Sequence, residues 1–269
     1  AGSGQNGLGN TTVYSSPVQV GSLTTWASVA GTGEHVLATT TGGKLYVWGK
    51  NNVGQLGLGD TSNRSSPVQV GTGTDWAFVG TGYSHSFGIK TNGTLWVWGK
   101  NNVGQLGLGN QTGNSSPVQL GTLTTWAFAV GSGYSSMALK TDSTLWVWGS
   151  NNNGQLGLGN TTNYSSPKQV GALTNWATVC IGSNNGLHAL ATKTDYTLWS
   201  WGNGTYGRLG RGNTTSYSSP VQIGSLTDWS TVSANTQTSF AIKTDSTLWS
   251  WGGNTYGQLA HGNTTLLSS

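Results

Sequence analysis

Hydrophobic and polar positions alternate in short runs along the whole chain, and turn-forming residues separate the runs. In one stretch the apolar runs cover residues 67–70, 76–80, 85–90 and 94–99. The segments between them are rich in Gly, Thr, Asn and Asp, which favour tight turns. No window has an apolar stripe of period 3.6 with capping residues, so helices are not expected. The pattern predicts four short strands in each stretch of about 50 residues.

This pattern recurs five times. The prolines that end a Ser-Ser-Pro motif are spaced by 50, 50, 50 and 53 residues, at Pro17, Pro67, Pro117, Pro167 and Pro220. The three additional residues of the fourth repeat lie within residues 180–193 and indicate a lengthened turn. Four strands per repeat, arranged around an axis, are typical of a β-propeller blade. We therefore expect an all-β propeller of five four-stranded blades, forming one domain over residues 1–269.

The last strand of each repeat is apolar on both sides. In "LWVWG", Leu95 and Val97 point to one side of the strand, and Trp96 and Trp98 point to the other. A strand packed between two neighbouring blades has this composition, so we interpret the tryptophans as core residues. Each indole N–H then needs an acceptor, which the Ser-, Thr- and Asn-rich turns can supply. The alternative is that the tryptophans are stacking platforms for sugars or bases.

The glycine-rich segment "GQLGLG" follows this strand, and it suggests a phosphate-binding loop at first sight. No Lys-Ser or Lys-Thr pair follows it, and no helix is predicted to begin there, so the usual anion site is missing. We instead expect the glycines to allow a tight crossover between blades. Leu56 and Leu58 would then lie in the seam between two blades.

Charge is scarce and scattered. The chain has 11 Lys and Arg and 7 Asp and Glu, which give a net charge of +4 at pH 7. Without a run or patch of basic residues, no nucleic-acid partner is expected. No apolar run approaches the ~18 residues of a membrane span, so membrane insertion is not expected either.

The residues that could carry chemistry follow the repeat instead of gathering in one place. Cys180 has no cysteine partner, and we expect a buried, unreactive thiol. The repeated histidines occupy a position where other repeats have Ser or Thr, so they are predicted to donate hydrogen bonds to a neighbouring turn: His35, His85 and His188. Three carboxylates recur in a Lys-Thr-Asp turn as turn formers: Asp142, Asp195 and Asp245. We therefore predict no catalytic residue, no metal ligand and no cofactor, and hence no enzyme.

The combined pattern resembles the regulator of chromosome condensation repeat family. The Ser-Ser-Pro, Trp-Gly and Gly-Gln-Leu-Gly landmarks stand in that family's order and at its period over essentially the whole chain. The resemblance implies a propeller of four-stranded blades. In the best-known eukaryotic members it also implies guanine-nucleotide exchange on a small GTPase and contact with chromatin. Seven repeats are usual in the family, whereas this chain has five. Low-charge, nearly identical copies are more similar to the family's bacterial, phage and giant-virus members.

Three functions are compatible with these features. The leading hypothesis is a non-enzymatic structural, display or binding propeller, as in a viral structural or decoration protein or a surface-exposed interaction module. It implies an extracellular or virion-surface location and a partner that is a protein or another virion or surface component. One alternative is a multivalent lectin-like binder of glycans; another is an exchange-factor-like hub for protein interactions. The candidate ligand-binding residues are aromatic side chains in turns and loops: Tyr83, Tyr134, Tyr206 and Tyr256.

The two ends of the chain duplicate one segment. Residues 4–16, "GQNGLGNTTVYSS", correspond to residues 257–269, "GQLAHGNTTLLSS". A closed five-bladed ring has room for one such crossover. We therefore predict a closed ring with the surplus copy displaced onto the rim or toward a neighbouring chain, which leaves oligomer formation open. The alternative is that these repeats are part of a seven-bladed propeller.

Overall fold

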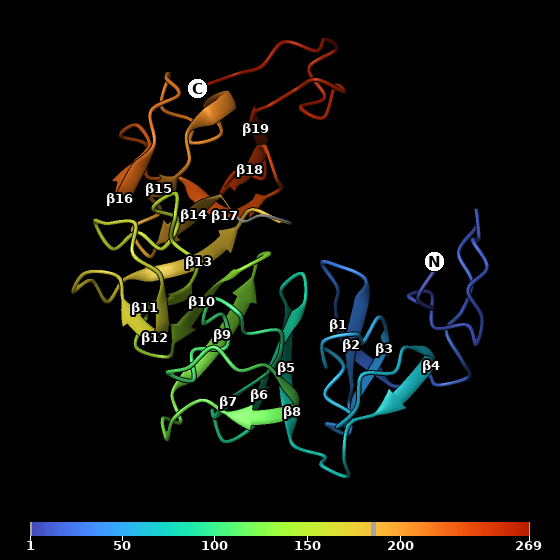
Figure 1. The fold of residues 1–269 in the computed structure, drawn as a ribbon. Coiled ribbons are helices and arrows are strands. Elements are labelled where there is room, and N and C mark those ends of the chain that lie inside the picture. The colour runs from blue at the N-terminus through green and yellow to red at the C-terminus, as the bar shows by residue number, and fades with distance from the viewer. Residues whose placement is uncertain (1, 184–186, 269) are drawn as a thin grey trace.

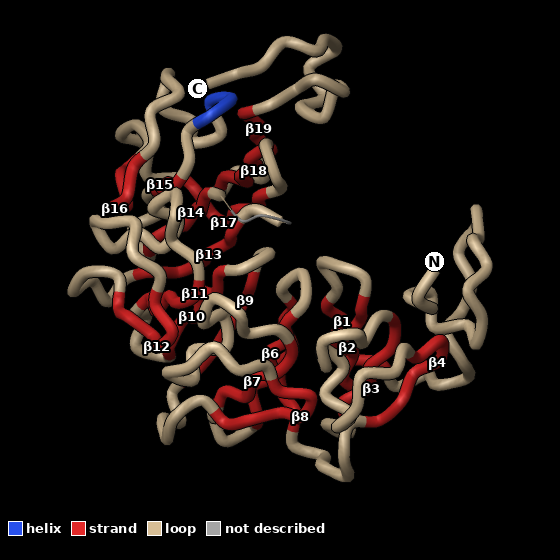
Figure 2. The backbone as a smooth tube through the Cα atoms, viewed as in Figure 1, coloured by secondary structure: helices blue, strands red, loops and turns tan. Residues whose placement is uncertain are grey.

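The structure is a computed structural model that describes residues 2–183 and 187–268. Within these residues, five antiparallel sheets follow one another along an arc, coloured from blue to red in Figure 1. Figure 2 shows strands throughout and a single short helical turn, η1 (Thr205–Gly207). The all-β propeller architecture predicted from the repeat is thus confirmed. None of the described residues forms a helix long and apolar enough to cross a membrane.

Each sheet is one blade. The first blade consists of β1 (Trp26–Ala30), β2 (His35–Thr40), β3 (Leu45–Gly49) and β4 (Arg64–Gln69). The second consists of β5 (Trp76–Thr81), β6 (His85–Lys90), β7 (Leu95–Gly99) and β8 (Asn114–Gln119). The third consists of β9 (Trp126–Gly131), β10 (Ser135–Lys140), β11 (Leu145–Gly149) and β12 (Tyr164–Gln169). The fourth consists of β13 (Trp176–Ile181), β14 (His188–Lys193), β15 (Leu198–Gly202) and β16 (Tyr217–Gln222), and the fifth of β17 (Trp229–Ala234), β18 (Thr238–Lys243) and β19 (Leu248–Gly252).

The sheets are offset from the sequence repeat. The strand expected to begin at Pro67 is β4, which begins at Arg64 and pairs with β3 of the preceding sequence repeat, with Val47 opposite Val68. Each complete blade therefore takes its fourth strand from the next repeat. For this reason the fifth blade has three strands among the described residues, and not the four that were predicted. Only the bridge between Gly252 and Leu267 marks the place where a fourth strand would begin.

The arc does not close, which contradicts the predicted five-bladed ring. The innermost strands β1, β5, β9, β13 and β17 pack on one another in sequence order, but the fifth blade does not pack on the first among the described residues. The packing between neighbouring blades fixes the angle from one blade to the next, and the four steps between the five blades leave a wide gap between the first and the last. No copy of the duplicated segment is surplus in this arrangement. The first copy lies against the first blade, where Trp48 Nε1 donates to the carbonyl of Gln5 at 2.9 Å.

The hydrophobic core lies between blades. The Leu and Val side chains on one side of the first blade and Leu56 of its crossover form one buried cluster with Trp76, Val79 and Trp98 of the second blade. Leu56 is buried and Leu58 is half-buried against this cluster, as expected for the seam. Each blade thus supplies half of two cores. The insertion expected within residues 180–193 includes residues 184–186, which lie outside the described residues.

Candidate binding surface

The three repeated histidines lie in the seams. The Nε2 atoms of His35, His85 and His188 lie 2.9–3.0 Å from a serine hydroxyl of the next blade. For His85 this partner is Ser136, whose hydroxyl donates to the carbonyl of Gln105 at 2.7 Å. Nε2 must therefore donate to the serine, as predicted, although the acceptor is a strand residue and not a turn. Burial lowers the pKa of His85 to about 3, so the ring is neutral at pH 7.

The other residues considered for chemistry, Cys180 and the repeated aspartates, are placed as core and turn residues. Although Cys180 as a residue is half-buried, burial raises the pKa of its thiol to about 12. The carboxylate of Asp142 accepts hydrogen bonds from the backbone N–H and the hydroxyl of Thr144, at 3.0 and 2.6 Å, as a turn former. The described residues contain no group of three or more His, Cys, Asp or Glu side chains that could hold a metal ion.

Most of the tryptophans pack in the core, as the sequence indicated, whereas Trp249 of the last blade is 48 % exposed. Trp98 is fully buried, and its indole N–H donates to the carbonyl of Gln55 at 2.9 Å. Trp96 is half-buried and donates to Thr94 Oγ1 at 3.0 Å, so a turn threonine does supply an acceptor. The first tryptophan of a blade differs, because the indole nitrogens of Trp126, Trp176 and Trp229 are buried without a partner.

Two of the predicted tyrosines lie at one end of the blades, in the turns between the first and second strands. Tyr83 is 40 % exposed in the β5–β6 turn, and Tyr134 is 37 % exposed in the β9–β10 turn. We call this end, with the turns at residues 31–34, 82–84 and 132–134, the turn face. Its backbone is held across blades, since the N–H of Tyr83 donates to the carbonyl of Ser132 at 2.8 Å. The two aromatic rings therefore project from fixed turns.

A lysine of the preceding blade contacts Tyr134, and a second lysine forms an ion pair on the same face. Lys100 Nζ lies 5.1 Å from the ring centroid of Tyr134, within the range of a cation–π interaction. Lys50 forms an ion pair with Glu34 on the same face. The hydrogen bond with Glu34 raises the pKa of Lys50, and Tyr83 contributes to the same direction. The turn face thus presents two exposed tyrosines, one lysine–tyrosine contact and one ion pair.

The other two predicted tyrosines lie in crossovers. Tyr206 is 42 % exposed and lies over the buried guanidinium of Arg208, with 5.5 Å between the ring centroid and the guanidinium carbon. Arg208 also donates to the carbonyl of Thr236 at 2.9 Å, which connects it to the β17–β18 turn. Tyr256 is 90 % exposed in the crossover after β19. The predicted tyrosines are thus spread along the arc, and among the described residues no two of their rings pack together.

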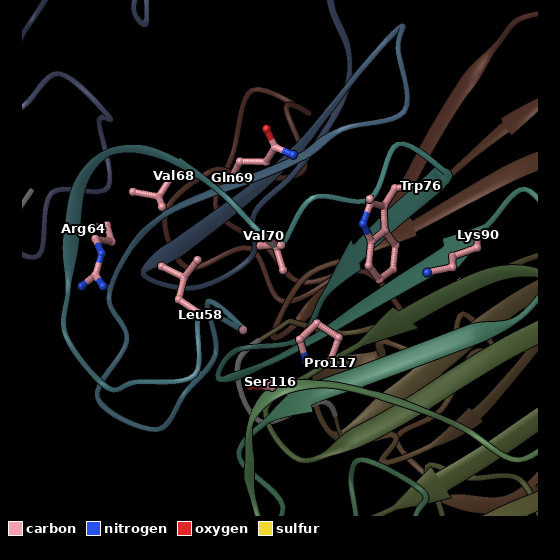
Figure 3. A pocket seen from close by; sticks show the side chains of 12 residues that line it. Leu58, Arg64, Val68, Gln69, Val70, Trp76, Lys90, Ser116 and Pro117 are labelled. Carbon is pink, nitrogen blue, oxygen red and sulfur yellow. The ribbon is translucent and has the colours of Figure 1, made fainter.

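Sequence reasoning missed a second surface, a groove between the outer strands of neighbouring blades. Three equivalent grooves follow the first, second and third blades, with volumes of about 600, 530 and 380 Å³. Figure 3 shows the first, in which Leu58, Val70, Trp76 and Pro117 surround an apolar centre between Arg64 and Lys90. The sequence does carry a signal for it, since Gly73 stands where the other repeats have Leu.

Solved structures with the same fold include two of yeast Prp20 and one of human WBSCR16. Yeast RCC1 (Prp20) bound to Kap60 is 20% identical with a TM-score of 0.77, over 90% of this chain and 59% of that one. Human WBSCR16 is 21% identical with a TM-score of 0.78, over 90% and 65%. Prp20p from Saccharomyces cerevisiae, reported with its binding properties to Gsp1p and histones, is 21% identical with a TM-score of 0.76, over 90% and 61%. The chain spans less than two thirds of these proteins, and at this identity the likeness shows the fold alone.

Family models give a finer assignment than single proteins. No curated protein matches the chain by sequence. The model of the regulator of chromosome condensation (RCC1) repeat matches residues 42–89, 92–139, 142–187 and 197–242, which is more than half of the chain. A second model of the same repeat matches residues 26–55, 76–105, 127–155 and 229–258. The chain therefore belongs to the regulator of chromosome condensation (RCC1) repeat family.

Proposed function

We propose that this chain is a non-catalytic propeller that binds a protein partner through its turn face. The observation that carries the proposal is the pair of exposed tyrosines on one face, Tyr83 and Tyr134, with Lys100 of the neighbouring blade over the Tyr134 ring. Tyrosine is enriched at protein interfaces because it adds a large contact area and a hydroxyl at a low cost in side-chain entropy. The turns that carry both rings are held by hydrogen bonds between blades, which reduces the entropy lost on binding.

The buried histidines and the weakly acidic Cys180 thiol support the non-catalytic part of this proposal. A general base must reach its substrate with a pKa near the working pH, and His85 meets neither condition. Low charge and nearly identical blades further favour a structural or display role on a virion or cell surface. The solved complex of Prp20 with Kap60 supports protein binding by a chain of this fold.

The test compares capture by matched variants. The purified chain would be immobilised and incubated with extracts of its source, and bound proteins would be identified with and without Tyr83→Ala and Tyr134→Ala together. We expect the double variant to lose a specific partner while its unfolding midpoint is unchanged. Tyr196→Ser is the control: Tyr196 is 51 % exposed in the β14–β15 turn at the opposite end, and Ser143 and Ser246 share its positive φ. Retention of every partner by the double variant would exclude the turn face.

A lectin-like function is the second candidate, because exposed tyrosines also stack on sugars. Several equivalent weak sites would act together through avidity. A glycan array distinguishes the two: saturable binding that is lost in the same double variant would favour glycans over a protein partner. An exchange-factor-like role predicts, instead, capture of a nucleotide-free GTPase.

A further inference from the structure

The groove between the first and second blades differs from its repeats at two positions. Gly73 stands where the other repeats have Leu23, Leu123, Leu173 and Leu226. Arg64 stands where the next blades have Asn114, Tyr164 and Tyr217. Both residues line this groove, which is larger than the two equivalent grooves, at about 600 Å³. In a chain of near copies, two such departures at one place mark a groove with a specific use.

Gly73 leaves the indole N–H of Trp76 accessible. The Leu side chains lie beside the tryptophan in the other grooves, where Trp126 Nε1 and Trp176 Nε1 are sealed from solvent without a partner. Trp76 Nε1 is not sealed in this way, and no described residue accepts a hydrogen bond from it. In Figure 3 its indole nitrogen lies on the side of the ring that faces Val70 and Gln69. The groove therefore offers a free hydrogen-bond donor beside its apolar centre.

Two cations flank that centre. Figure 3 places Arg64 on one side of Leu58 and Val70 and Lys90 on the other, beside Trp76. Arg64 is held by Asp60 at 2.6 Å and Lys90 by Asp75 at 3.1 Å, so both cations are positioned before any ligand arrives. Neither carboxylate lines the groove, whereas both cations do. A ligand lying in the groove thus meets an ion pair at each end, and the cation of each pair is the member that lines the groove.

We propose that this groove binds an extended segment of another protein in which a bulky apolar side chain lies between acidic residues. The apolar side chain would contact Leu58, Val70 and Pro117, and a main-chain carbonyl would accept from Trp76 Nε1. The acidic side chains would pair with Arg64 and Lys90 as charge-assisted hydrogen bonds. None of the tyrosines of the turn face lines the groove, so this site is separate from the proposed partner surface and does not depend on it.

The test uses a defined peptide and the Trp76 indole signal. The ¹⁵N-labelled chain would be titrated with acetyl-Asp-Asp-Leu-Asp-Asp-amide, with its lysine counterpart, and with a version carrying Gly in place of Leu. Trp76→Phe assigns the Trp76 signal, and the other indole signals report the fold. We expect a saturable shift of the Trp76 signal with the acidic leucine peptide, at a concentration about tenfold lower than with either control peptide.

Gly73→Leu is the matched variant, because it introduces the residue of the other four repeats. Gly73 has no positive φ, and an added Cβ would meet a carboxylate oxygen of Asp75 at 3.1 Å and Trp76 Nε1 at 3.7 Å. The fifth repeat has Leu226 and Asp228 at the same two positions, so the fold accepts both residues there. We expect it to weaken peptide binding at least about tenfold, and Arg64→Asn to weaken it several-fold with less dependence on salt. Tyr83→Ala should change nothing.

Three outcomes would overturn the proposal. One is the absence of a Trp76 shift at about 10 mM peptide, well above a millimolar Kd. Another is equal binding of the acidic and the lysine peptides, because the flanking cations would then have no role. The third is undiminished binding by a folded Gly73→Leu chain together with undiminished binding by Arg64→Asn. These three outcomes concern the groove alone, so they stay the same if the turn-face variants show that the proposed partner surface is wrong.

Discussion

The middle of the arc and its two ends carry the same residues in different surroundings. Leu95 is fully buried, whereas the equivalent Leu248 of the last blade is 67% exposed. At the other end, Val29 of the first blade is 70% exposed, and the equivalent Val79 of the second blade is 3% exposed. The difference shows that burial in this fold depends on the adjacent blade. A blade contributes two half-cores, and each is completed by a neighbour.

Acid should disrupt the seams between neighbouring blades most strongly, because each repeated histidine is buried in one of them. Burial lowers the pKa of His35 to about 4 and those of His85 and His188 to about 3, from 6.5. Between these values the unfolded chain binds more protons than the folded one, so the stability is present above pH 6.5 and is lost as the pH falls. From about pH 7 to about pH 5 we expect a loss of about 2 kcal/mol for each histidine. Chemical denaturation at several pH values would measure it.

His85→Ser is the matched control for this acid effect, because Ser135 occupies the same position in the third blade. The variant should fold, and its free energy of unfolding should fall by about 2 kcal/mol less than that of the unmodified chain between about pH 7 and about pH 5. A pH dependence equal to that of the unmodified chain would mean that His85 is hydrated and protonated in its seam, contrary to the structure.

Trp98→Ala should produce the next largest effect. Trp98 is fully buried in a seam with a blade on either side, so its removal should destabilise the fold by about 3–5 kcal/mol. Trp48 is the equivalent residue of the first blade, where it borders an open apolar groove of about 400 Å³ with Trp26 and Val29. We therefore expect a smaller loss for Trp48→Ala. Unfolding midpoints in denaturant compare the two, and an unchanged midpoint for Trp98→Ala would revive the tryptophans as ligand-binding residues.

The sequence predicted most of a blade because its signals are local. Strand positions, the burial of the strand Leu95–Gly99 on both sides, and the turn role of Asp142 all follow from neighbouring residues. The number of strands in the last blade and the open arc could not be predicted in this way. Both depend on which repeat supplies β4, β8, β12 and β16, and on the angle between blades, which the packing of many side chains determines.

The candidate surface was predicted less completely for a similar reason. An exposed tyrosine such as Tyr83 can be recognised in a turn sequence, because turns lie at the surface. The outer groove could not, because its walls come from residues far apart in the chain, such as Leu58 and Pro117. Gly73 was visible as a departure from the repeat, but the nearness of Asp75 and Trp76 to it became clear only in the structure.

A leucine pair measures the difference between the middle and the last blade. Leu95→Ala should cost about 2–5 kcal/mol, the usual range for emptying a buried leucine site. Leu248→Ala should cost less than about 1 kcal/mol, because most of the side chain is already in water. Both values come from denaturant unfolding of the two variants under the same conditions. Equal losses would show that the exposed side of the last blade is covered in solution.

The valine pair tests the opposite end, with the smallest expected effect. Val79→Ala removes two buried methylene equivalents and should cost about 1–2 kcal/mol. Val29→Ala should change the free energy of unfolding by less than about 0.5 kcal/mol, as for an exposed surface site.

A loss for Val29→Ala as large as that for Val79→Ala would mean that something packs on the first blade. Concentration dependence then separates the two explanations. A second copy of the chain on this side would make the loss grow with protein concentration, since association stabilises the folded state by mass action. A loss independent of concentration would instead require the fifth blade to reach the first within one chain. Only that result would restore the closed five-bladed ring predicted from the repeat count.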